Sequence, residues 1–154
     1  MIKKIKLTQG KYALVSKADF ERVNEHKWCY SHGYAVRRIK VAYKKYKNLY
    51  MHRFLMDAQK AQIVDHKNMN PLDNSRPNLR LATKSQNLAN QGMASHNTSG
   101  YKGAVRVGDG WMTQISINNK NVRIGIFLSK EEAAAAHNAA AIAVHGDYAR
   151  LNSL

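Results

Sequence analysis

Short runs of alternating apolar and polar residues fill the first third of the chain. Period-two alternation is typical of half-buried strands. Residues 18–23 instead favour one or two helical turns. The pattern predicts a small β-rich antiparallel unit over residues 1–50. The segments expected to be strands are 3–8, 12–16, 28–31, 34–39 and 47–52.

In residues 51–91 the pattern is different and predicts the order strand, loop, strand, helix. We expect a strand at 62–66 and a turn-rich loop at 68–77, after a short helical segment at 52–56. A helix over 84–90 would be capped by Thr83 or Ser85, since hydroxyl side chains accept hydrogen bonds from the first turn. Residues 92–99 have linker composition and no periodicity.

The remaining residues, 100–154, predict three strands and one helix. Ser129 and Glu132 have the spacing of a capping box, and the alanine-rich helix that follows is expected to stop at Gly146. The whole chain is therefore predicted to be α+β. The expected strands are 101–107, 110–118 and 121–127, joined by turns at 108–110 and 118–120.

Alternation along these strands predicts two unlike faces. Ile115 and Ile117 share one face, and we expect the helix to cover an apolar face that includes Val122, Ile124 and Ile126. The opposite face would carry side chains able to contact phosphates and base edges: Lys102, Arg106, Gln114, Ser116, Asn121 and Arg123. Trp111 fits either hairpin packing or a contact with sugar or base.

The charge of the chain indicates a polyanionic partner. Its 154 residues carry a net charge of +15, and residues 1–50 hold +10 of it, from 13 basic and 3 acidic side chains. The single cysteine excludes an internal disulfide and a zinc site built from cysteine pairs. No apolar run approaches a membrane span, so we expect a cytoplasmic protein with no membrane or disulfide partner.

Four polar residues have the chemistry for cleaving a phosphodiester. His66 titrates near neutral pH and could deprotonate water. Asp65 and Asn87 offer hard oxygen ligands for Mg²⁺ or Mn²⁺, and Asn78 could tie the loop to the strand. Taken singly, each has an ordinary explanation, as a surface pair, a cap or a turn residue. Together at this spacing they favour the catalytic interpretation.

Residues 50–91 resemble the HNH (ββα-metal) endonucleases, especially the phage and intron-encoded homing branch. The matching motifs are His-Arg at 52–53, Val-Asp-His-x-Asn at 64–68, Asn-Pro-Leu-Asp-Asn at 70–74 and Asn-Leu-Arg at 78–80. The resemblance implies His66 as general base, Asp65 and Asn87 as ligands of one Mg²⁺ or Mn²⁺, and Asn78 as loop organiser. Asn87 replaces the last His of the signature, which argues against Zn²⁺. Whether Asn90 also takes part in binding the metal stays open.

The basic residues around this set are candidates for DNA contact. Arg53, Arg76 and Arg80 could clamp phosphates or be solvated cations, and Lys67 could steer the backbone beside His66. His52 is expected to pack beneath the site and not to bind metal.

Residues 100–152 resemble an AP2 domain. The matching stretches are 100–106, 111–117, 122–127 and 131–134, with His145-Gly146 and Asn152 at the end. The resemblance implies a three-stranded antiparallel sheet packed on one helix, with the sheet entering the major groove. Gln, Ser and Asn replace several Arg and Trp positions of the plant family, so no target sequence carries over.

The sequence thus predicts a monomeric, homing-type HNH endonuclease that nicks duplex DNA. It would be encoded by a phage and act in the cytoplasm of the host cell. Its domains would be 1–50 and 51–91 for the nuclease, 92–99 for the linker and 100–154 for the AP2-like reader. One alternative is a sequence-specific DNA-binding protein with a degenerate nuclease unit. Another is a phage structural or packaging protein, which would keep the basic charge without needing His66.

Overall fold

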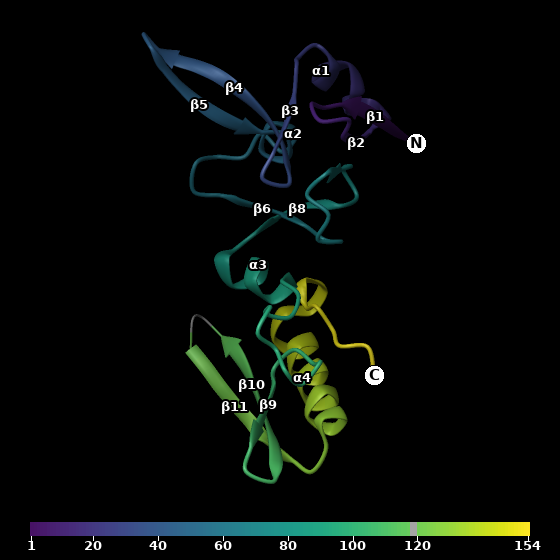
Figure 1. The fold of residues 1–154 in the computed structure, drawn as a ribbon, viewed down its shortest axis with the longest axis vertical. Helices are drawn as coiled ribbons and strands as arrows, with labels where there is room; N and C mark the ends of the chain where they lie inside the picture. The colour runs from purple at the N-terminus through teal and green to yellow at the C-terminus, as the bar shows by residue number, and fades with distance from the viewer. Residues whose placement is uncertain (118–119) are drawn as a thin grey trace. The chain divides into compact units, whose positions relative to one another are not determined.

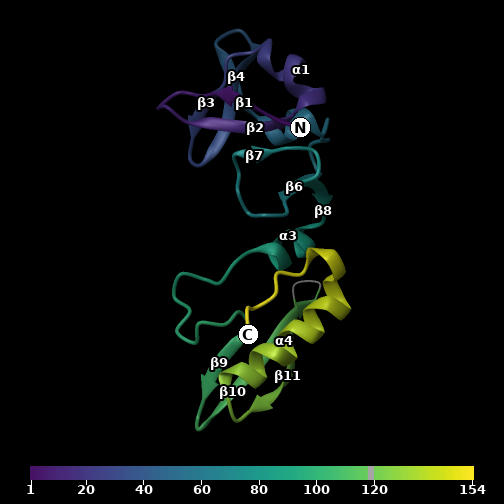
Figure 2. The same ribbon diagram turned by 90° about the vertical axis from the view of Figure 1, so that its right-hand side faces the viewer.

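A computed structural model describes residues 1–117 and 120–154. Its contacts divide the chain into two compact units, Met1–Ala82 (unit 1) and Thr83–Leu154 (unit 2) (Figures 1 and 2). The protein is mixed α+β, as predicted. The division comes before the predicted linker at 92–99, so the helix expected to complete the nuclease motif is grouped with unit 2.

Unit 1 is built from small sheets and two short helices. Three sheets have the strand orders β1-β2-β7, β3-β4-β5 and β6-β8. The elements are β1 (Ile2–Lys6), β2 (Tyr12–Ser16), α1 (Phe20–Asn24), β3 (Cys29–Ser31), β4 (Tyr34–Ala42), β5 (Lys45–Tyr50), α2 (Met51–Leu55), β6 (Ile63–His66), β7 (Asp73–Asn74) and β8 (Leu79–Ala82), with a 3₁₀ turn at Lys17–Asp19.

One apolar core holds these elements of unit 1 together. Val15 from β2, Met51 and Leu55 from α2, and Trp28 are buried in it. The Trp28 indole donates a hydrogen bond to the carbonyl of Val23, so its polar edge is satisfied inside the core. Burial of these side chains fixes α2, and with it the residues at 50–53, against β4, β5 and β7.

Most predicted elements of unit 1 are confirmed, several with shifted ends, and the loop predicted at 68–77 contains the short strand β7. The strand at 12–16 is β2, and the helical turns at 18–23 appear as the 3₁₀ turn and α1. The strand predicted at 47–52 ends at Tyr50, because the chain continues into α2. Met51 and Leu55 are four residues apart and both buried, which is the spacing of one helix face.

Unit 2 contains a three-stranded antiparallel sheet of order β11-β10-β9 and two helices. Side chains of Thr83 and Ser129 accept hydrogen bonds from Gln86 N and Glu132 N, so both helices begin with a capping box. Asn118 and Asn119, in one predicted turn, lie outside the described residues. The elements are α3 (Lys84–Asn90), β9 (Ala104–Val107), β10 (Gly110–Ile117), β11 (Lys120–Phe127) and α4 (Lys130–His145), with a 3₁₀ turn at Gly146–Tyr148.

The helix α4 lies along one face of this sheet (Figure 2). The prediction that Val122, Ile124 and Ile126 pack together under it is wrong, because all three are exposed. Thr113 pairs with Gly125 but Gln114 pairs with Arg123, so Ile124 is an extra residue in β11. Such a bulge changes the face presented by every residue beyond it.

Small residues take the place of the predicted apolar face. Ala104, Thr113 and Ile115 are the buried residues of the sheet, and Ala133 and Ala134 are buried in α4. Small side chains allow close approach of helix and sheet.

In residues 1–117 and 120–154, we find no helix of the length and apolar character needed to cross a membrane.

Candidate functional site

Asp65 and Arg80 face each other across the antiparallel β6–β8 pair. Nε and Nη2 of Arg80 each lie 2.8 Å from Oδ2 of Asp65, and the side chains of Arg80 and Asp65 are only 11% and 7% exposed. Both groups sit where a lone charge would be costly, so each neutralises the other. The predicted metal ligand is thus held by a residue predicted to contact phosphate.

The loop between these strands is closed by Asn78. Its side-chain oxygen accepts from Asn68 N at 3.0 Å, and its amide nitrogen donates to Asp73 O at 2.7 Å. The backbone of Lys67 donates to Asn78 O at 2.9 Å. These bonds join the first residues of the loop to its last, which fixes the end of β6 where His66 lies.

His66 is buried and oriented by Asn74, which is fully buried beside it. His66 Nε2 lies 3.3 Å from Asn74 Oδ1, while the Asn74 amide nitrogen donates to Pro71 O at 3.4 Å. Because an amide oxygen can only accept, this arrangement assigns the proton to Nε2 and the basic lone pair to Nδ1. Sequence reasoning missed Asn74, since the asparagines of this loop all resemble turn residues.

Aromatic rings surround His66 on the side of α2 and β4. The His52 ring meets the His66 ring edge-to-face with centroids 5.0 Å apart, and Tyr34 lies 5.6 Å from His52 and 6.4 Å from His66. Tyr50 completes the cluster, 5.5 Å from His52. His52 therefore packs against the candidate base, in agreement with the interpretation that it is a packing residue.

This packing changes the proton affinity of both imidazoles. Burial lowers the pKa of His66 below its ordinary value, although hydrogen bonding to Asn74 and the charge of Asp65 oppose the shift. The pKa of His52 is lowered to about 3, first by burial and then because a proton on His52 would be repelled by a protonated His66 and by Arg53. Both rings are therefore neutral at neutral pH, and a neutral His66 is in the protonation state that a general base requires.

Two further arginines predicted to contact DNA have partners inside unit 1. Arg53 donates to three backbone carbonyls of the segment 58–62, at 2.6 to 3.3 Å. Arg76 forms a two-point ion pair with the buried Asp19, at 2.9 and 2.7 Å. Both guanidiniums thereby hold loops of the fold, and their contact with phosphate stays a prediction. Lys67, in contrast, is exposed beside His66.

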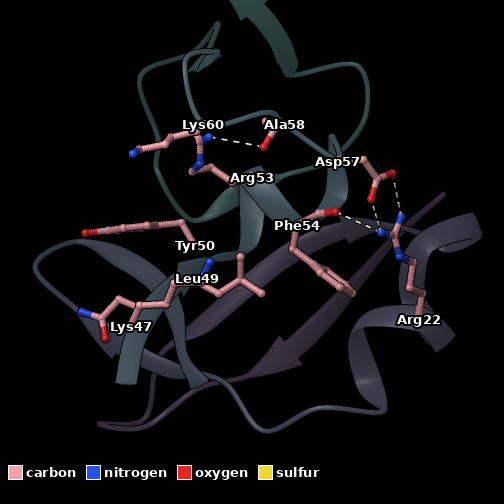
Figure 3. A pocket seen from close by; sticks show the side chains of 10 residues that line it. Arg22, Lys47, Leu49, Tyr50, Arg53, Phe54, Asp57, Ala58 and Lys60 are labelled. Atoms are coloured by element: carbon pink, nitrogen blue, oxygen red, sulfur yellow. Dashed lines mark hydrogen bonds and ion pairs between the residues drawn. The ribbon is translucent and has the colours of Figure 1, made fainter. Parts of the chain in front are cut away.

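Exposed basic charge in unit 1 gathers on the β4–β5 hairpin, whose tip reaches out from the rest of the unit (Figure 1). Residues 40–48 are all exposed and include four lysines, and the Arg38 guanidinium stacks over the ring of Tyr46 at 4.8 Å. A hollow of about 560 Å³ lies between this hairpin and α2, with Lys47, Lys60 and Arg22 among its lining residues (Figure 3). This surface suits a phosphate backbone.

In unit 2, the register places four of the predicted DNA contacts on one exposed face. Gln114 pairs with Arg123, and Ser116 pairs with Asn121. Directly paired residues of antiparallel strands project to the same side, so these four form two polar rows on the side away from α4.

The other predicted DNA contacts of unit 2 lie elsewhere. Arg106 pairs with Trp111 and its guanidinium sits 5.4 Å from the ring centroid, on the opposite side of the sheet. The Lys102 ammonium donates to the carbonyls of Ala89 and Gln91, and the residue is half-buried. Lys102 therefore ties the segment after α3 to the sheet, and its contact with DNA stays a prediction.

A metal site must be judged by its donor set. In residues 1–117 and 120–154, no three His, Cys, Asp or Glu side chains are grouped to hold a metal ion. The predicted pair, a carboxylate from Asp65 and an amide oxygen from Asn87, suits Mg²⁺ chemically, because waters and phosphate oxygens complete its shell. Asn87 lies on α3, which packs against α4 and β10 in unit 2; its pairing with Asp65 stays a prediction.

Comparison with known proteins agrees with this chemistry over a limited segment. A family model described as HNH endonuclease matches residues 60–89, the stretch that contains Asp65, His66, Asn78 and Asn87. Searches of characterised proteins and of solved structures found no match. The family match supports an HNH nuclease domain in this segment and, with it, a nuclease-type function.

Proposed function

We propose that the protein is a homing-type HNH endonuclease that nicks duplex DNA with the help of a divalent metal ion. The observation that carries the proposal is His66, a neutral, buried imidazole oriented by Asn74 inside the HNH-matching segment. An imidazole held in one tautomer is prepared to accept a proton from water. DNA is the substrate that an HNH nuclease domain implies, and the net charge of +15 agrees with it.

In this proposal the residues of the segment divide the work. His66 takes a proton from the attacking water through Nδ1, while Asn74 keeps Nε2 protonated and the ring fixed. Asn78 holds the loop that carries both. Asp65 and Asn87 would hold Mg²⁺ or Mn²⁺, which when bound neutralises charge on the phosphate. Asp65 must then share its carboxylate with Arg80 or release it.

We further propose that unit 2 acts as an AP2-like reader that positions the cut. Its exposed polar rows, Gln114 with Arg123 and Ser116 with Asn121, have side chains that can donate to and accept from base edges. One candidate base per chain favours cutting one strand. The hairpin β4–β5 and Lys67 would add contacts with phosphates that do not depend on sequence.

A plasmid assay tests the nuclease activity. Supercoiled plasmid carrying a selected site should be nicked with Mg²⁺ and stay intact with EDTA. His66→Ala should lower the nicking rate by about 10² to 10⁴-fold, the usual share of a general base, with unchanged DNA affinity in EDTA. His96→Ala, an exposed histidine outside the matched segment, is the control. A His66→Ala variant that nicks as fast as the control would refute the assignment.

A second candidate is a DNA-binding protein without nuclease activity, favoured by the contact that holds Asp65 to Arg80. It predicts sequence-selective binding with no nicking in Mg²⁺ or Mn²⁺ at any protein concentration. The same plasmid assay, combined with binding measured in EDTA, separates the two candidates.

A further inference from the structure

The face of the unit 2 sheet away from α4 is apolar at one end. Met112 on the central strand pairs with Val105 on β9 and with Ile126 on β11. Because direct partners project to the same side, these three side chains form a row across the whole sheet. Val105 and Ile126 are 48% and 49% exposed, so within unit 2 the row is open to solvent.

The row is held in place by the backbone beneath it. A methyl group added at Gly110 would lie 2.7 Å from Cγ2 of Ile126, so the Ile126 side chain rests directly over Gly110. Ile126 and Val105 are also β-branched, and such side chains keep few rotamers on a strand. An exposed apolar surface that is already ordered loses little conformational entropy when a partner covers it.

Charge on the same sheet indicates what kind of partner covers the row. On the side of the sheet that carries the row, β11 contributes the cation Arg123, and none of the three strands contains an acidic residue. Two acidic side chains outside the strands, Asp109 in the β9–β10 turn and Glu132 in the first turn of α4, line a hollow together with Ile126 at one end of the row. Arg123 beside the row and the net charge of +15 on the chain favour a polyanion as the partner. The apolar row also lies directly beside the polar row of Gln114 and Arg123, two residues further along β10.

We propose that the row Val105–Met112–Ile126 reads thymine, by contacting the C5-methyl groups in the major groove. This inference rests on the reader role proposed for unit 2. Thymine is the base that presents an apolar group to the major groove, whereas guanine and adenine present the acceptors and donors that Arg and Gln match. The target site should therefore place thymines next to the purines contacted by Arg123 and Gln114.

Uracil substitution tests this inference on the full-length chain. Binding sites are first selected from random duplexes in EDTA, where DNA is not cut. Each thymine of the selected site is then replaced by uracil, which removes the methyl group and keeps the base pair. One or two neighbouring positions should lose about fourfold in affinity per methyl group, the value expected for burying one such apolar group.

Variants connect this loss to the row. At the affected positions, the Ile126→Ala and Val105→Ala variants should bind the duplex with thymine and the duplex with uracil equally well. Ile142→Ala removes an equally apolar, 55% exposed side chain from α4 and should retain the fourfold preference for thymine. Circular dichroism melting checks that each variant folds, and Ile126→Val serves if Ile126→Ala does not, with a reduced preference expected.

Three results would overturn the inference. A selected site that tolerates uracil at every thymine removes the methyl contacts but leaves the reader role intact. A thymine preference that persists in both row variants assigns it to other residues. Sedimentation that shows a dimer broken by Ile126→Ala, without any thymine preference, assigns the row to a second copy of the chain. Failure to select any sequence would refute the reader role itself.

Discussion

Removing the guanidinium of Arg80 should destabilise unit 1 strongly. Arg80→Met keeps most of the aliphatic volume but takes away both contacts with Oδ2 of Asp65. The carboxylate is 7% exposed, so water cannot replace the lost donors. The variant therefore measures how much the fold depends on neutralising this one buried charge.

The magnitude follows from burial. Breaking a buried ion pair by removing one member costs about 3 to 5 kcal/mol. For a unit of this size, each kcal/mol shifts the melting temperature by about 4 to 8 °C, so Arg80→Met should lower that of unit 1 by at least about 12 °C. Replacing both members, as in Asp65→Leu with Arg80→Met, should cost much less than the sum of the single changes.

Trp28 provides the assay. It is buried in the core of unit 1, and Trp111 is the other tryptophan of the chain. In a Trp111→Phe background, tryptophan fluorescence therefore follows the unfolding of unit 1 in urea. Arg22→Met is the matched control, because Arg22 and its partner Asp57 are 40% and 70% exposed. That variant should unfold close to wild type, since exposed ion pairs contribute little.

Two outcomes would refute the reasoning. If Arg80→Met unfolded within about 1 kcal/mol of wild type, or if the two single changes were additive, the pair would not be buried and coupled.

Mg²⁺ gives a further readout. If Asp65 binds the ion, Mg²⁺ at about 100 times its dissociation constant should return about 2.7 kcal/mol to Arg80→Met. The double variant, which lacks the carboxylate, should gain nothing.

Three other changes test the site and its surroundings. Asn74→Ala should slow nicking by about 10 to 100-fold, by analogy with other residues that orient a functional histidine, without affecting DNA binding in EDTA; an unchanged rate would contradict the positioning role. Lys67→Gln should lower the salt dependence of DNA binding by about one unit of slope, measured by titration at several salt concentrations, and an unchanged slope would remove it from the interface. Burial, with the nearby charges of Lys102 and His145, lowers the pKa of His137 below its ordinary 6.5. Protonation is thus easier in the unfolded chain, and unit 2 should lose stability as the pH falls below about 6.5. Urea unfolding followed by Trp111 in a Trp28→Phe variant measures this loss, which His137→Leu should abolish.

Local signals predicted the elements that depend on neighbouring residues. The helix at 130–145 agrees with the structure because Ser129 and Glu132 fix its start and Gly146 ends it. The helix at 84–90 likewise begins after Thr83. A capping box satisfies backbone donors within one turn of the chain, so these few residues suffice to predict where each helix begins.

Pairings between distant residues could not be predicted in this way. The strand β7 lies inside the predicted loop and pairs in parallel with β2, so that Asp73 stands opposite Leu14. The ion pairs of Asp65 with Arg80 and of Asp19 with Arg76 also depend on the folded register. A sequence shows a cation and a carboxylate but not their distance, and the alternation rule likewise failed beyond the bulge at Ile124.

These internal partners change the meaning of the net charge of +15. Arg76 and Arg80 are held by carboxylates, and Arg53 and Lys102 by backbone carbonyls. Salt-dependent binding reflects the cations that replace counterions on phosphates, and cations with internal partners are less available for that. The exposed lysines at 40–48 keep this capacity. Non-specific affinity should therefore depend more on the β4–β5 hairpin than on the arginines that the sequence placed around His66.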